Sequence, residues 1–431
     1  MTAVLEEPLT WRNIRERDFY LDIPEPVYYG PTWQRGPLGN FIAPEFTLGW
    51  QIIRWVEANL LDDEGRRFIL TNEQKRLLLW WYAIDETGRW IYSEGIITRL
   101  KGWGKDPFAA VLCAVEFVGP CRFGGWLTVD RPDLGLVKHD PIAIENPRAW
   151  IQLAAVSKDQ NRNTMKLFPG LFSAKCIEEH GISLGKEVIY AHAGARTIEA
   201  VTSSPKALEG GRPSLTVMNE THHWLLNNEG HEMAEVIDRN VAKSKGGRSR
   251  TLSITNAYDP SQNSVAQQQR EAWEDQRDGL AIDTGILYDS IEAAENAFSD
   301  LPEKPTGEYS DRGDEIKIKP TDEEVMAYVG AIVDSVRGDA HWLDVEAILQ
   351  RIFNRKNPLS TSRRFYYNQV VTADDAWLHA DAIRLLPHPY ALEQRGVGPA
   401  GDDYAAGWAL VHPNDEIVMF FDGSKSRDAT A

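Results

Sequence analysis

Short apolar runs and amphipathic stretches of helical spacing alternate along most of this chain. The runs at residues 91–98 and 150–156 are short and apolar, as buried strands are, whereas residues 105–118 carry apolar side chains three and four positions apart, as a helix does. Other strands are predicted at 187–190, 197–202, 215–218, 251–256 and near 286, and other helices at 46–61, 72–84, 231–242, 260–278 and in a stretch ending near 179. The alternation predicts an α/β fold with a doubly wound, mainly parallel sheet, in which ligands bind at the carboxyl ends of the strands.

Changes in composition divide the chain into five predicted parts. Residues 1–43 are rich in Pro, Gly and aromatic residues and predict an arm wrapped on a core or a partner, with an exposed loop as the alternative. Residues 44–319 form the α/β domain, and its polar, acidic end from about 302 is interpreted as a linker or surface loop. The remaining parts are a small helical subdomain at 320–386, a Pro- and Gly-rich linker at 387–415 and a new strand at 416–431.

The overall charge limits how the chain can contact nucleic acid. Its 46 Lys and Arg against 64 Asp and Glu give a formal net charge of −18, so a polyanion is not attracted over the whole surface and any contact must follow a local basic track. The Gly- and Ser-rich loop after residue 242 supplies such a track in Lys243, Lys245, Arg248 and Arg250. No apolar stretch approaches the roughly 20 residues of a membrane span, and the charged N-terminus differs from a signal peptide, so we expect a cytoplasmic protein without membrane contact.

The three cysteines carry no pattern of a metal site or a disulfide. Cys113, Cys121 and Cys176 have neither CxxC spacing nor a paired framework. We therefore expect them to be small, buried apolar residues.

A glycine-rich turn joins the strand at 91–98 to the helix at 105–118. Its residues Gly102, Trp103, Gly104 and Lys105 offer backbone that bends around an anion, amides at a helix N-terminus and an ammonium group. This is the chemistry of a Walker A phosphate loop, although Arg99 stands where that pattern has its first Gly and Asp106 where it has Ser or Thr. The alternative is a tight strand-to-helix connection with one exposed lysine.

The strand at 215–218 ends in Asn219 and Glu220, where a Walker B strand presents a magnesium-binding Asp and a catalytic Glu. We hypothesise that the metal-binding carboxylate has moved from the strand to Asp106, with helix capping by Asp106 as the alternative. Adjacent histidines tend to point in different directions, so His222 and His223 are interpreted as core or hydrogen-bonding residues rather than as a metal site.

Gln74 lies in the first turn of the helix that precedes the glycine-rich turn. One interpretation is that its amide hydrogen-bonds an adenine, whose edge offers both a donor and an acceptor. The alternative is a solvated helix residue.

Taken together, these residues resemble the large terminase subunit of tailed bacteriophages, the motor that pumps DNA into a procapsid. The resemblance consists of Gln74, the loop RLKGWGKD, the segment SKDQ, the strand VMNE, the segment SITNA and the late FDGSKSRDATA. It implies a P-loop (RecA/ASCE-like) ATPase domain, followed by the first strand of an RNase H-like nuclease domain in which Asp422 binds a catalytic metal.

The resemblance also implies individual roles. Lys105 holds the β- and γ-phosphates of ATP, Glu220 orients the attacking water, and Thr255 with Asn256 senses the γ-phosphate and couples hydrolysis to movement. Asp106 and Asn219 depart from the residues that bind Mg²⁺ in such proteins, and our hypothesis is that together they bind the Mg²⁺ that accompanies ATP. Such terminases often carry an arginine at the position of Lys101, so an arginine finger must come from Arg99 or from a neighbouring subunit.

The implied partners are double-stranded DNA, the portal protein and the small terminase subunit, in a pentameric ring on the procapsid inside the infected host and not in the mature virion. Only 9 residues follow Asp422, so we expect an interrupted nuclease domain that does not cut DNA, whereas a full-length form would do so with Mg²⁺ or Mn²⁺. Two alternatives remain: another nucleic-acid-translocating ATPase such as a helicase, and a structural packaging component with a degenerate loop.

Overall fold

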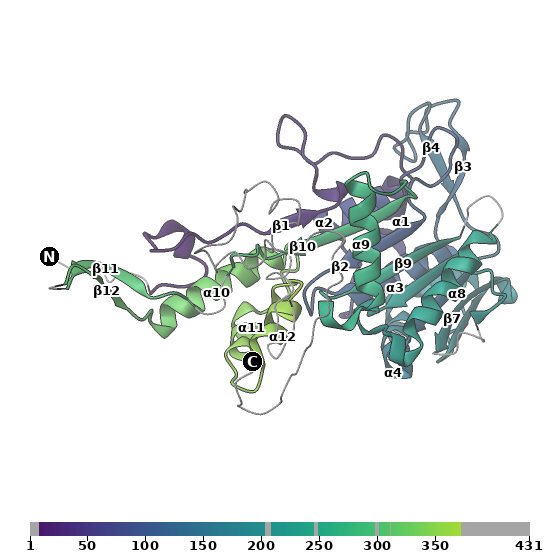
Figure 1. Cartoon of the computed structure of the whole chain (residues 1–431). Coiled ribbons are helices and arrows are strands. Elements are labelled where there is room, and N and C mark those ends of the chain that lie inside the picture. Colours follow the sequence, from purple (N-terminus) through teal and green to yellow (C-terminus); the bar gives the residue numbers. More distant parts are fainter. Residues whose placement is uncertain (1–7, 203–207, 245–248, 298–300, 311, 372–431) are drawn as a thin grey trace, which may run out of the picture. The chain divides into compact units, whose positions relative to one another are not determined.

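The computed structural model describes residues 8–202, 208–244, 249–297, 301–310 and 312–371. These residues lie in one compact unit of the chain, Met1–Asp374. Figure 1 shows this unit as a twisted sheet with helices packed against it and a helical region formed by α10, α11 and α12. The predicted strand at 416–431, with Asp422, lies outside the described residues.

One sheet of eight strands forms the centre of the α/β region. In spatial order its strands are β1 (Val27–Tyr29), β10 (Ile286–Glu292), β2 (Glu94–Thr98), β9 (Arg250–Thr255), β8 (Leu215–Asn219), β5 (Trp150–Ala155), β7 (Arg196–Thr202) and β6 (Val188–Ala191). The six inner strands run parallel, and β1 and β6 pair antiparallel at the two edges. The predicted α/β fold with a largely parallel sheet is confirmed, and the carboxyl ends of β2, β9 and β8 lie side by side.

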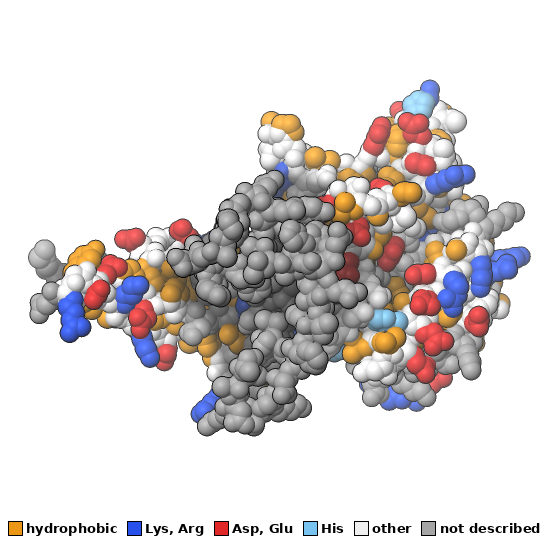
Figure 2. Space-filling view, viewed as in Figure 1, with side chains coloured by type: hydrophobic (Ala, Val, Ile, Leu, Met, Phe, Trp, Pro, Cys, Tyr) orange, Lys and Arg blue, Asp and Glu red, His pale blue; other side chains and the backbone are white. Residues whose placement is uncertain are grey.

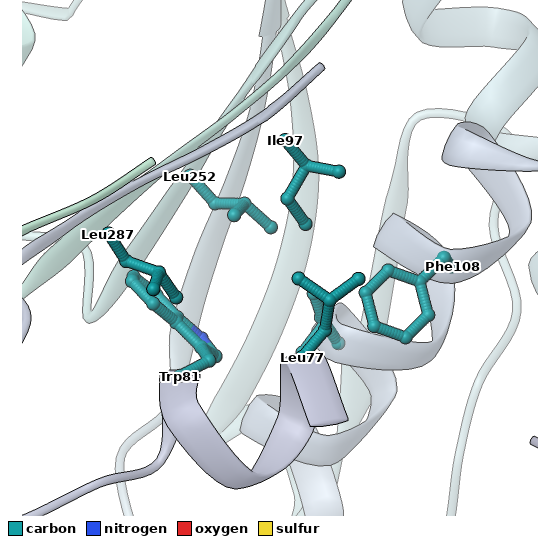
Figure 3. A pocket seen from close by; sticks show the side chains of 7 residues that line it. Leu77, Trp81, Ile97, Phe108, Leu252 and Leu287 are labelled. Carbon is teal, nitrogen blue, oxygen red and sulfur yellow. The ribbon is translucent and has the colours of Figure 1, made fainter. Parts of the chain in front are cut away.

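The helices of the α/β region pack on this sheet or on one another. They are α1 (Gly49–Asn59), α2 (Asn72–Trp81), α3 (Lys105–Val118), α4 (Lys158–Met165), α5 (Phe168–Leu171), α6 (Ala174–His180), α8 (Gly230–Ala242) and α9 (Val265–Arg277). Twelve of the 14 residues of α3 are buried, which explains why that helix is apolar on every side. Figure 3 shows Leu77 and Trp81 of α2 and Phe108 of α3 gathered against Leu252 and Leu287 of the sheet.

The single helix expected to end near residue 179 is instead three short helices, α4, α5 and α6. The sequence FPGL forms α5, and Ser173 then caps α6 by accepting a hydrogen bond from the backbone N–H of Cys176 at 3.2 Å. A cap of this kind starts a new helix. The connection from β5 to β6 is thus divided into three short helices.

Several strands were not anticipated from the sequence. The predicted arm contributes β1, which pairs with β10, and the predicted loop after 302 contains the hairpin of β11 (Lys304–Tyr309) and β12 (Glu315–Ile318). A further hairpin joins β3 (Arg122–Trp126) to β4 (Pro141–Ile144). Residues of β11 and β12 are mostly exposed, so they lack the apolar alternation by which strands are recognised. The short 3₁₀ helices are η1 (Ile14–Glu16), η2 (Pro31–Trp33), η3 (His192–Gly194), η4 (Thr221–His223), η5 (Leu226–Asn228) and η6 (Pro260–Gln262).

The helical region comprises α10 (Asp322–Val336), α11 (Val345–Ile352) and α12 (Leu359–Tyr366). The chain after α12 returns to the carboxyl ends of the strands, where the amide of Asn368 donates to Thr98 O at 3.2 Å and to Ile291 O at 2.8 Å. This buried residue therefore ties the helical region to β2 and β10. None of the helices in the described part of the chain combines the length and apolar character needed to cross a bilayer. All three cysteines are buried and free, as predicted.

Candidate functional site: a glycine-rich loop at the carboxyl ends of the parallel strands

The loop at residues 99–104 joins β2 to α3 and turns at two glycines. Gly102 and Gly104 have φ of 92° and 91°, in the left-handed region that other residues rarely adopt. Helix α3 starts immediately afterwards, so its first backbone N–H groups, which have no partner within the helix, lie at the end of this loop. Trp103 is only 1% exposed and packs edge-on against Phe108, so its ring is not accessible to a ligand.

The connection between α10 and α11 lies against the same turn. Trp342 donates its indole N–H to the carbonyl oxygen of Gly102 at 3.1 Å. A Cβ atom added to Gly102 would lie 2.6 Å from Cδ2 of Leu343, and one added to Gly104 would lie 3.2 Å from Cζ2 of Trp342. The glycines thus serve both the turn and a close approach by the helical region.

Lys105 is buried, which contradicts the alternative of an exposed lysine on a simple connection. Its ammonium donates to the carbonyl oxygens of Arg99 at 3.0 Å and Leu100 at 3.2 Å. It forms no ion pair with any described residue, although it is only 7% exposed. Burial lowers the pKa of Lys105 to about 8, against the opposing effect of Glu220 and Asp106. The loop therefore holds a buried cation whose charge no carboxylate neutralises directly.

Asp106 and Asn219 lie next to each other. The hypothesis that Asp106 supplies the metal-binding carboxylate in place of Asn219 requires this proximity. The amide of Asn219 donates to Asp106 Oδ1 at 3.0 Å and to the hydroxyl oxygen of Thr164 at 3.2 Å, and that hydroxyl donates to Asp106 Oδ1 at 3.3 Å. Asp106 does not cap α3, because the N-cap is Gly104 and the helix start has no side-chain cap. The amide oxygen of Asn219 is buried without a partner among the described residues. Three oxygen-bearing side chains from α3, α4 and β8 thus meet beside Lys105.

Glu220 follows β8 in a left-handed backbone conformation, with φ 56°. Its backbone N–H donates to Ile254 O at 2.8 Å, which holds the residue against β9. Burial raises the pKa of the Glu220 carboxyl, an effect that the Lys105 ammonium opposes. The carboxylate of Glu220 and the ammonium of Lys105 therefore interact electrostatically.

His222 connects Glu220 to the end of β9. Its Nε2 lies 3.3 Å from Oε2 of Glu220, without hydrogen-bond alignment, and its Nδ1 lies 2.9 Å from the hydroxyl oxygen of Thr255. The backbone N–H of His222 donates to that same oxygen at 3.0 Å. Burial, together with the nearby charges of His223 and Lys105, holds the pKa of His222 well below its usual range, so this imidazole is neutral at pH 7.

The expectation that the two histidines point in different directions is wrong. The rings of His222 and His223 have centroids 3.9 Å apart, and with Glu220 they present ligand atoms within 4.8 Å of one another. The positive charges of Lys105, Arg364 and Lys101 nevertheless act on His222 and disfavour a second cation. A hydrogen-bonding function, as predicted, fits these surroundings better than a metal site.

Asn256 contacts the glycine-rich loop directly. Its amide donates to the carbonyl oxygen of Arg99 at 2.7 Å, and the Lys105 ammonium binds the same oxygen. Thr255, one residue earlier, donates its hydroxyl to the carbonyl oxygen of Asn256 at 3.1 Å. The two residues predicted to couple hydrolysis to movement therefore link β9 to the loop and, through Thr255, to His222.

Arg99 has a structural environment that differs from that of a catalytic finger. It is fully buried, its Nε donates to Glu73 at 2.6 Å, and its guanidinium also pairs with Asp289. For Arg99 to reach a ligand, the buried carboxylates of Glu73 and Asp289 would both have to lose their ion pair with it. This environment contradicts the prediction that Arg99 is an arginine finger. Lys101 is exposed, and its ammonium lies 5.3 Å from the ring of Phe365.

Gln74 takes part in the start of α2. Its backbone N–H donates to the Thr71 hydroxyl oxygen at 3.2 Å, and its side-chain oxygen accepts from the Thr71 backbone N–H at 3.0 Å. This is a capping box, and it leaves Gln74 only 4% exposed. It corrects the solvated-residue alternative, while adenine binding by its remaining amide N–H groups stays a prediction.

The predicted basic track is only partly described. Lys243 is exposed near the end of α8, whereas Lys245 and Arg248 lie outside the described residues. Arg250 is 1% exposed and pairs with Glu116 at 2.8 Å, so it is a core residue and its assignment to the track is wrong. On the face in Figure 2, Lys and Arg side chains are interspersed with Asp and Glu rather than gathered in one large patch.

Sequence reasoning did not identify Thr164 as a member of the site. It comes from the polar helix α4, where nothing distinguishes it from neighbouring polar residues. Its hydroxyl becomes informative only because α4 packs beside the end of β8.

Fold and site together define an α/β protein that presents a cationic, glycine-rich loop at the carboxyl ends of parallel strands, the usual ligand site of such sheets. The chain belongs to the family of the Gene 13 proteins of mycobacteriophages. It is 39% identical over 436 residues to the Gene 13 protein of Mycobacterium phage L5, covering 94% of this chain and 68% of that protein. The Gene 13 protein of Mycobacterium phage D29 is 38% identical over 437 residues, with the same coverage. No protein-family model matches.

Solved structures of large terminases are similar to this chain. The large terminase of bacteriophage HK97 has 14% identity and a TM-score of 0.49, covering 75% of this chain and 56% of that one. The large terminase of the thermophilic bacteriophage D6E in complex with ADP has 10% identity and a TM-score of 0.30, covering 51% of this chain and 44% of that one. This chain therefore spans a little over half of the HK97 protein and about two thirds of the Gene 13 proteins.

Proposed function

We propose that this chain is the ATP-hydrolysing motor subunit of a phage terminase, which moves double-stranded DNA into a procapsid. The observation that carries the proposal is that Lys105 and Asp106, after β2, and Glu220, after β8, lie around a glycine turn and a helix N-terminus at the carboxyl ends of strands that β9 separates. Phosphoryl transfer needs charge neutralisation, a metal position and an aligned water rather than covalent chemistry, and these residues match those needs.

Lys105 is suited to bind the β- and γ-phosphates. Among the described residues, the partners of its ammonium are backbone carbonyls, which are weak partners for a buried cation. A triphosphate supplies the missing negative charge, and the first amides of α3 add hydrogen bonds to it. Gln74 is proposed to hydrogen-bond the adenine, and Gly102, Trp103 and Gly104 to contact phosphate through their backbone.

The cluster of Asp106, Thr164 and Asn219 fits a magnesium ion. All three offer oxygen atoms, which Mg²⁺ prefers, and the orphaned amide oxygen of Asn219 is available to accept from a metal-bound water. When bound, Mg²⁺ neutralises charge that develops on the transferred phosphoryl group. Asp106 supplies the negative charge of the cluster, in keeping with the transfer of the carboxylate from the strand to the helix.

Glu220 is proposed to align the attacking water, and His222 to position Glu220. The imidazole lies between the carboxylate of Glu220 and the hydroxyl of Thr255, so a shift at the end of β9 reaches Glu220 through one side chain. Asn256, on the Arg99 carbonyl, adds a second path from the loop to β9. Thr255 and Asn256 are thus placed to couple the state of the γ-phosphate to movement.

The remaining assignments belong to the assembled motor. We propose that it acts in the infected host as a pentameric ring with the portal protein and the small terminase subunit, and that a neighbouring subunit or Lys101 supplies the transition-state cation. Asp422 is proposed as a metal ligand of the nuclease in a full-length form, with Mg²⁺ or Mn²⁺.

The decisive experiment is steady-state ATP hydrolysis by the purified chain, with Mg²⁺ and with or without duplex DNA. Lys105→Ala should lower the rate at least about 1000-fold, and Glu220→Gln similarly, since each removes several kcal/mol of transition-state stabilisation. Glu220→Gln should still bind nucleotide, because its carboxylate acts on the water. Lys138→Ala is the matched control, a lysine exposed on the turn between β3 and β4, and it should leave the rate unchanged.

Three outcomes would contradict the proposal. Equal rates in wild type, Lys105→Ala and Glu220→Gln would remove the site assignment, and no hydrolysis by wild type with DNA would favour a structural component. Strand separation of a duplex during hydrolysis would instead identify a helicase.

A further inference from the structure

A second cluster of side chains of metal-binding type lies near the edge of the sheet formed by β6. Strand β2 lies toward the other edge. Glu145 follows β4, His180 is the last residue of α6, and His192 opens the turn η3 between β6 and β7. One ligand atom from each residue lies within 4.8 Å of the other two. We infer that Glu145, His180 and His192 bind a divalent transition metal ion, with zinc as the expected species.

The spacing of the two imidazoles fits a shared ion. Nδ1 of His180 and Nε2 of His192 are 3.2 Å apart, and the ring planes are inclined by 70°. Two nitrogen ligands of a tetrahedral zinc ion, each at about 2.0 to 2.1 Å, lie about 3.3 Å apart. Nitrogen atoms that already face each other at this distance need little rearrangement to bind an ion between them.

Glu145 completes a set of three ligands. Its Oε2 is 4.0 Å from Nε2 of His192, so a shift of less than about 1 Å brings it to the separation expected in a tetrahedral site. Its side chain is 42% exposed and has room for this movement. The exposed side of the cluster, formed by His192 and Glu145, leaves a fourth position to water.

Arg196 forms an ion pair with the carboxylate of Glu145. Its Nη2 lies 2.7 Å from Oε2 of Glu145, and its Nη1 donates to the carbonyl oxygen of Phe117 at 3.3 Å. A carboxylate has about four acceptor positions, so it can keep this hydrogen bond while it binds a metal. Partners of this kind orient metal-binding carboxylates, and the guanidinium charge is balanced by Glu145 itself.

The backbone holds His192 in an uncommon conformation. His192 and Ala193 have φ of 49° and 56°, so two consecutive residues other than glycine occupy the left-handed region. Such residues persist where the surroundings require them, and ligand sites are frequent examples. Here the conformation places the exposed His192 ring against the buried ring of His180.

The donor set selects the class of metal. Two imidazole nitrogens and one carboxylate oxygen suit Zn²⁺ and neighbouring transition metals, whereas Mg²⁺ prefers oxygen ligands only. This cluster is therefore chemically distinct from the site proposed for the nucleotide metal. An ion here would join the end of the β3–β4 hairpin, the end of α6 and the turn that closes the sheet edge, and it would stabilise the folded chain by mass action.

The test uses the full chain, stripped of metal with a chelator and then titrated with Zn²⁺ by calorimetry and with Co²⁺ by visible absorption. His223→Asn is included in every protein, to remove the other His-containing cluster at Glu220. We expect one zinc ion per chain, the absorption of four-coordinate cobalt, and a zinc-dependent rise in the melting temperature that excess Mg²⁺ does not reproduce.

His192→Asn should weaken zinc binding by more than about 100-fold. Loss of a residue that only hydrogen-bonds a metal ligand weakens binding by about 10- to 100-fold, so a larger loss identifies His192 as a ligand itself. Asn tolerates positive φ, so the turn should be kept, and the melting temperature without zinc serves to check this. His139→Asn is the matched control, because His139 is also exposed and has φ 75°. Equal zinc affinity in the two variants, or no zinc binding by either, would overturn the inference and leave the two imidazoles as a simple hydrogen-bonded pair.

Discussion

Two buried cations stand at the two ends of the same loop, and their surroundings differ. Arg99 is enclosed by the carboxylates of Glu73 and Asp289, so its charge is neutralised within the chain. Lys105, six residues later, has only carbonyl oxygens as partners within the described part of the chain, although it is nearly as buried. Burying a charge is costly unless a counter-charge accompanies it. The difference teaches that an unmatched charge, rather than burial or residue type, distinguishes the cation that we propose binds an anion.

A third buried cation, Arg250, agrees with this conclusion. It is the first residue of β9, so it lies at the opposite end of the parallel strands from Arg99 and Lys105. Arg250 and Arg122 both pair with the buried carboxylate of Glu116, at 2.8 and 2.6 Å. Arg250 belongs to the same basic run as Lys243, yet it is as enclosed as Arg99. A basic residue counted from the sequence is thus a candidate for ligand binding only if its charge is left unpaired.

The largest expected effect separates the two cations by stability. Arg99→Met should lower the free energy of unfolding by about 3 to 5 kcal/mol, because it leaves the buried carboxylates of Glu73 and Asp289 without their positive counter-charge. Lys105→Met removes an unmatched buried charge, so the nucleotide-free chain should be as stable as wild type or more so. Urea denaturation without nucleotide measures both. Similar losses in the two variants would show that Lys105 is also a structural cation.

The next effect tests whether Asp106 supplies the negative charge that binds the metal ion. Asp106→Asn should weaken Mg²⁺-dependent nucleotide binding by about 10- to 100-fold, the loss of one good charge-assisted contact. Binding measured without Mg²⁺ is the control and should change little. Asp106→Ser combined with Asn219→Asp should restore Mg²⁺-dependent binding. If Asp106→Asn changes only the melting temperature, the carboxylate of Asp106 has no metal function.

A smaller effect follows from the lowered pKa of Lys105. In the proposed site the charged ammonium binds phosphate, and burial lowers its pKa to about 8, so nucleotide affinity should fall by about tenfold per pH unit above pH 8. The stability of the nucleotide-free chain should change in the opposite direction between about pH 8 and the ordinary lysine value of 10.5. In that range the unfolded chain binds a proton that the folded chain does not, so the free energy of unfolding rises with pH.

Isothermal titration across this pH range measures the affinity, and urea denaturation measures the stability. Lys105→Met provides the comparison, because this component of both pH dependences should be absent from it. A wild-type affinity that stays constant to pH 10 would mean that the loop lysine keeps its charge without a ligand.

The smallest effect concerns DNA. Lys243→Gln should reduce the slope of the logarithm of DNA affinity against the logarithm of salt concentration by about 0.9, the share of one phosphate contact. The exposed Lys138→Gln is the control and should leave the slope unchanged. Equal slopes in all three proteins would place the DNA track away from α8.

The parts of the fold that repeat a local period were predictable from the sequence. Helix α3 and the inner strands were found because apolar spacing within a few residues determines them. Asp106 and Asn219 were recognised as a pair because each departs from a known pattern in a complementary way, and the structure brings them to 3.0 Å.

What escaped prediction depends on contacts between distant segments. Arg99 and Asp289 are 190 residues apart in the chain, and Thr164 reaches Asn219 across 55 residues, so no local pattern announces either contact. Strand β1 has only three residues, and it is a strand because β10 lies beside it. Arg250 was misread for the same reason, since only the assembled sheet shows that it points into the core.

The two outermost strands bear on how copies of this chain can associate. Strand β1 has three residues and β6 has four, and each runs against the direction of its neighbour. Short edge strands of this kind discourage a second sheet from adding on. Shortening the chain beyond Tyr29 would uncover the seven-residue β10 and invite aggregation, whereas the intact arm leaves side-chain surfaces, rather than strand pairing, to build any ordered assembly.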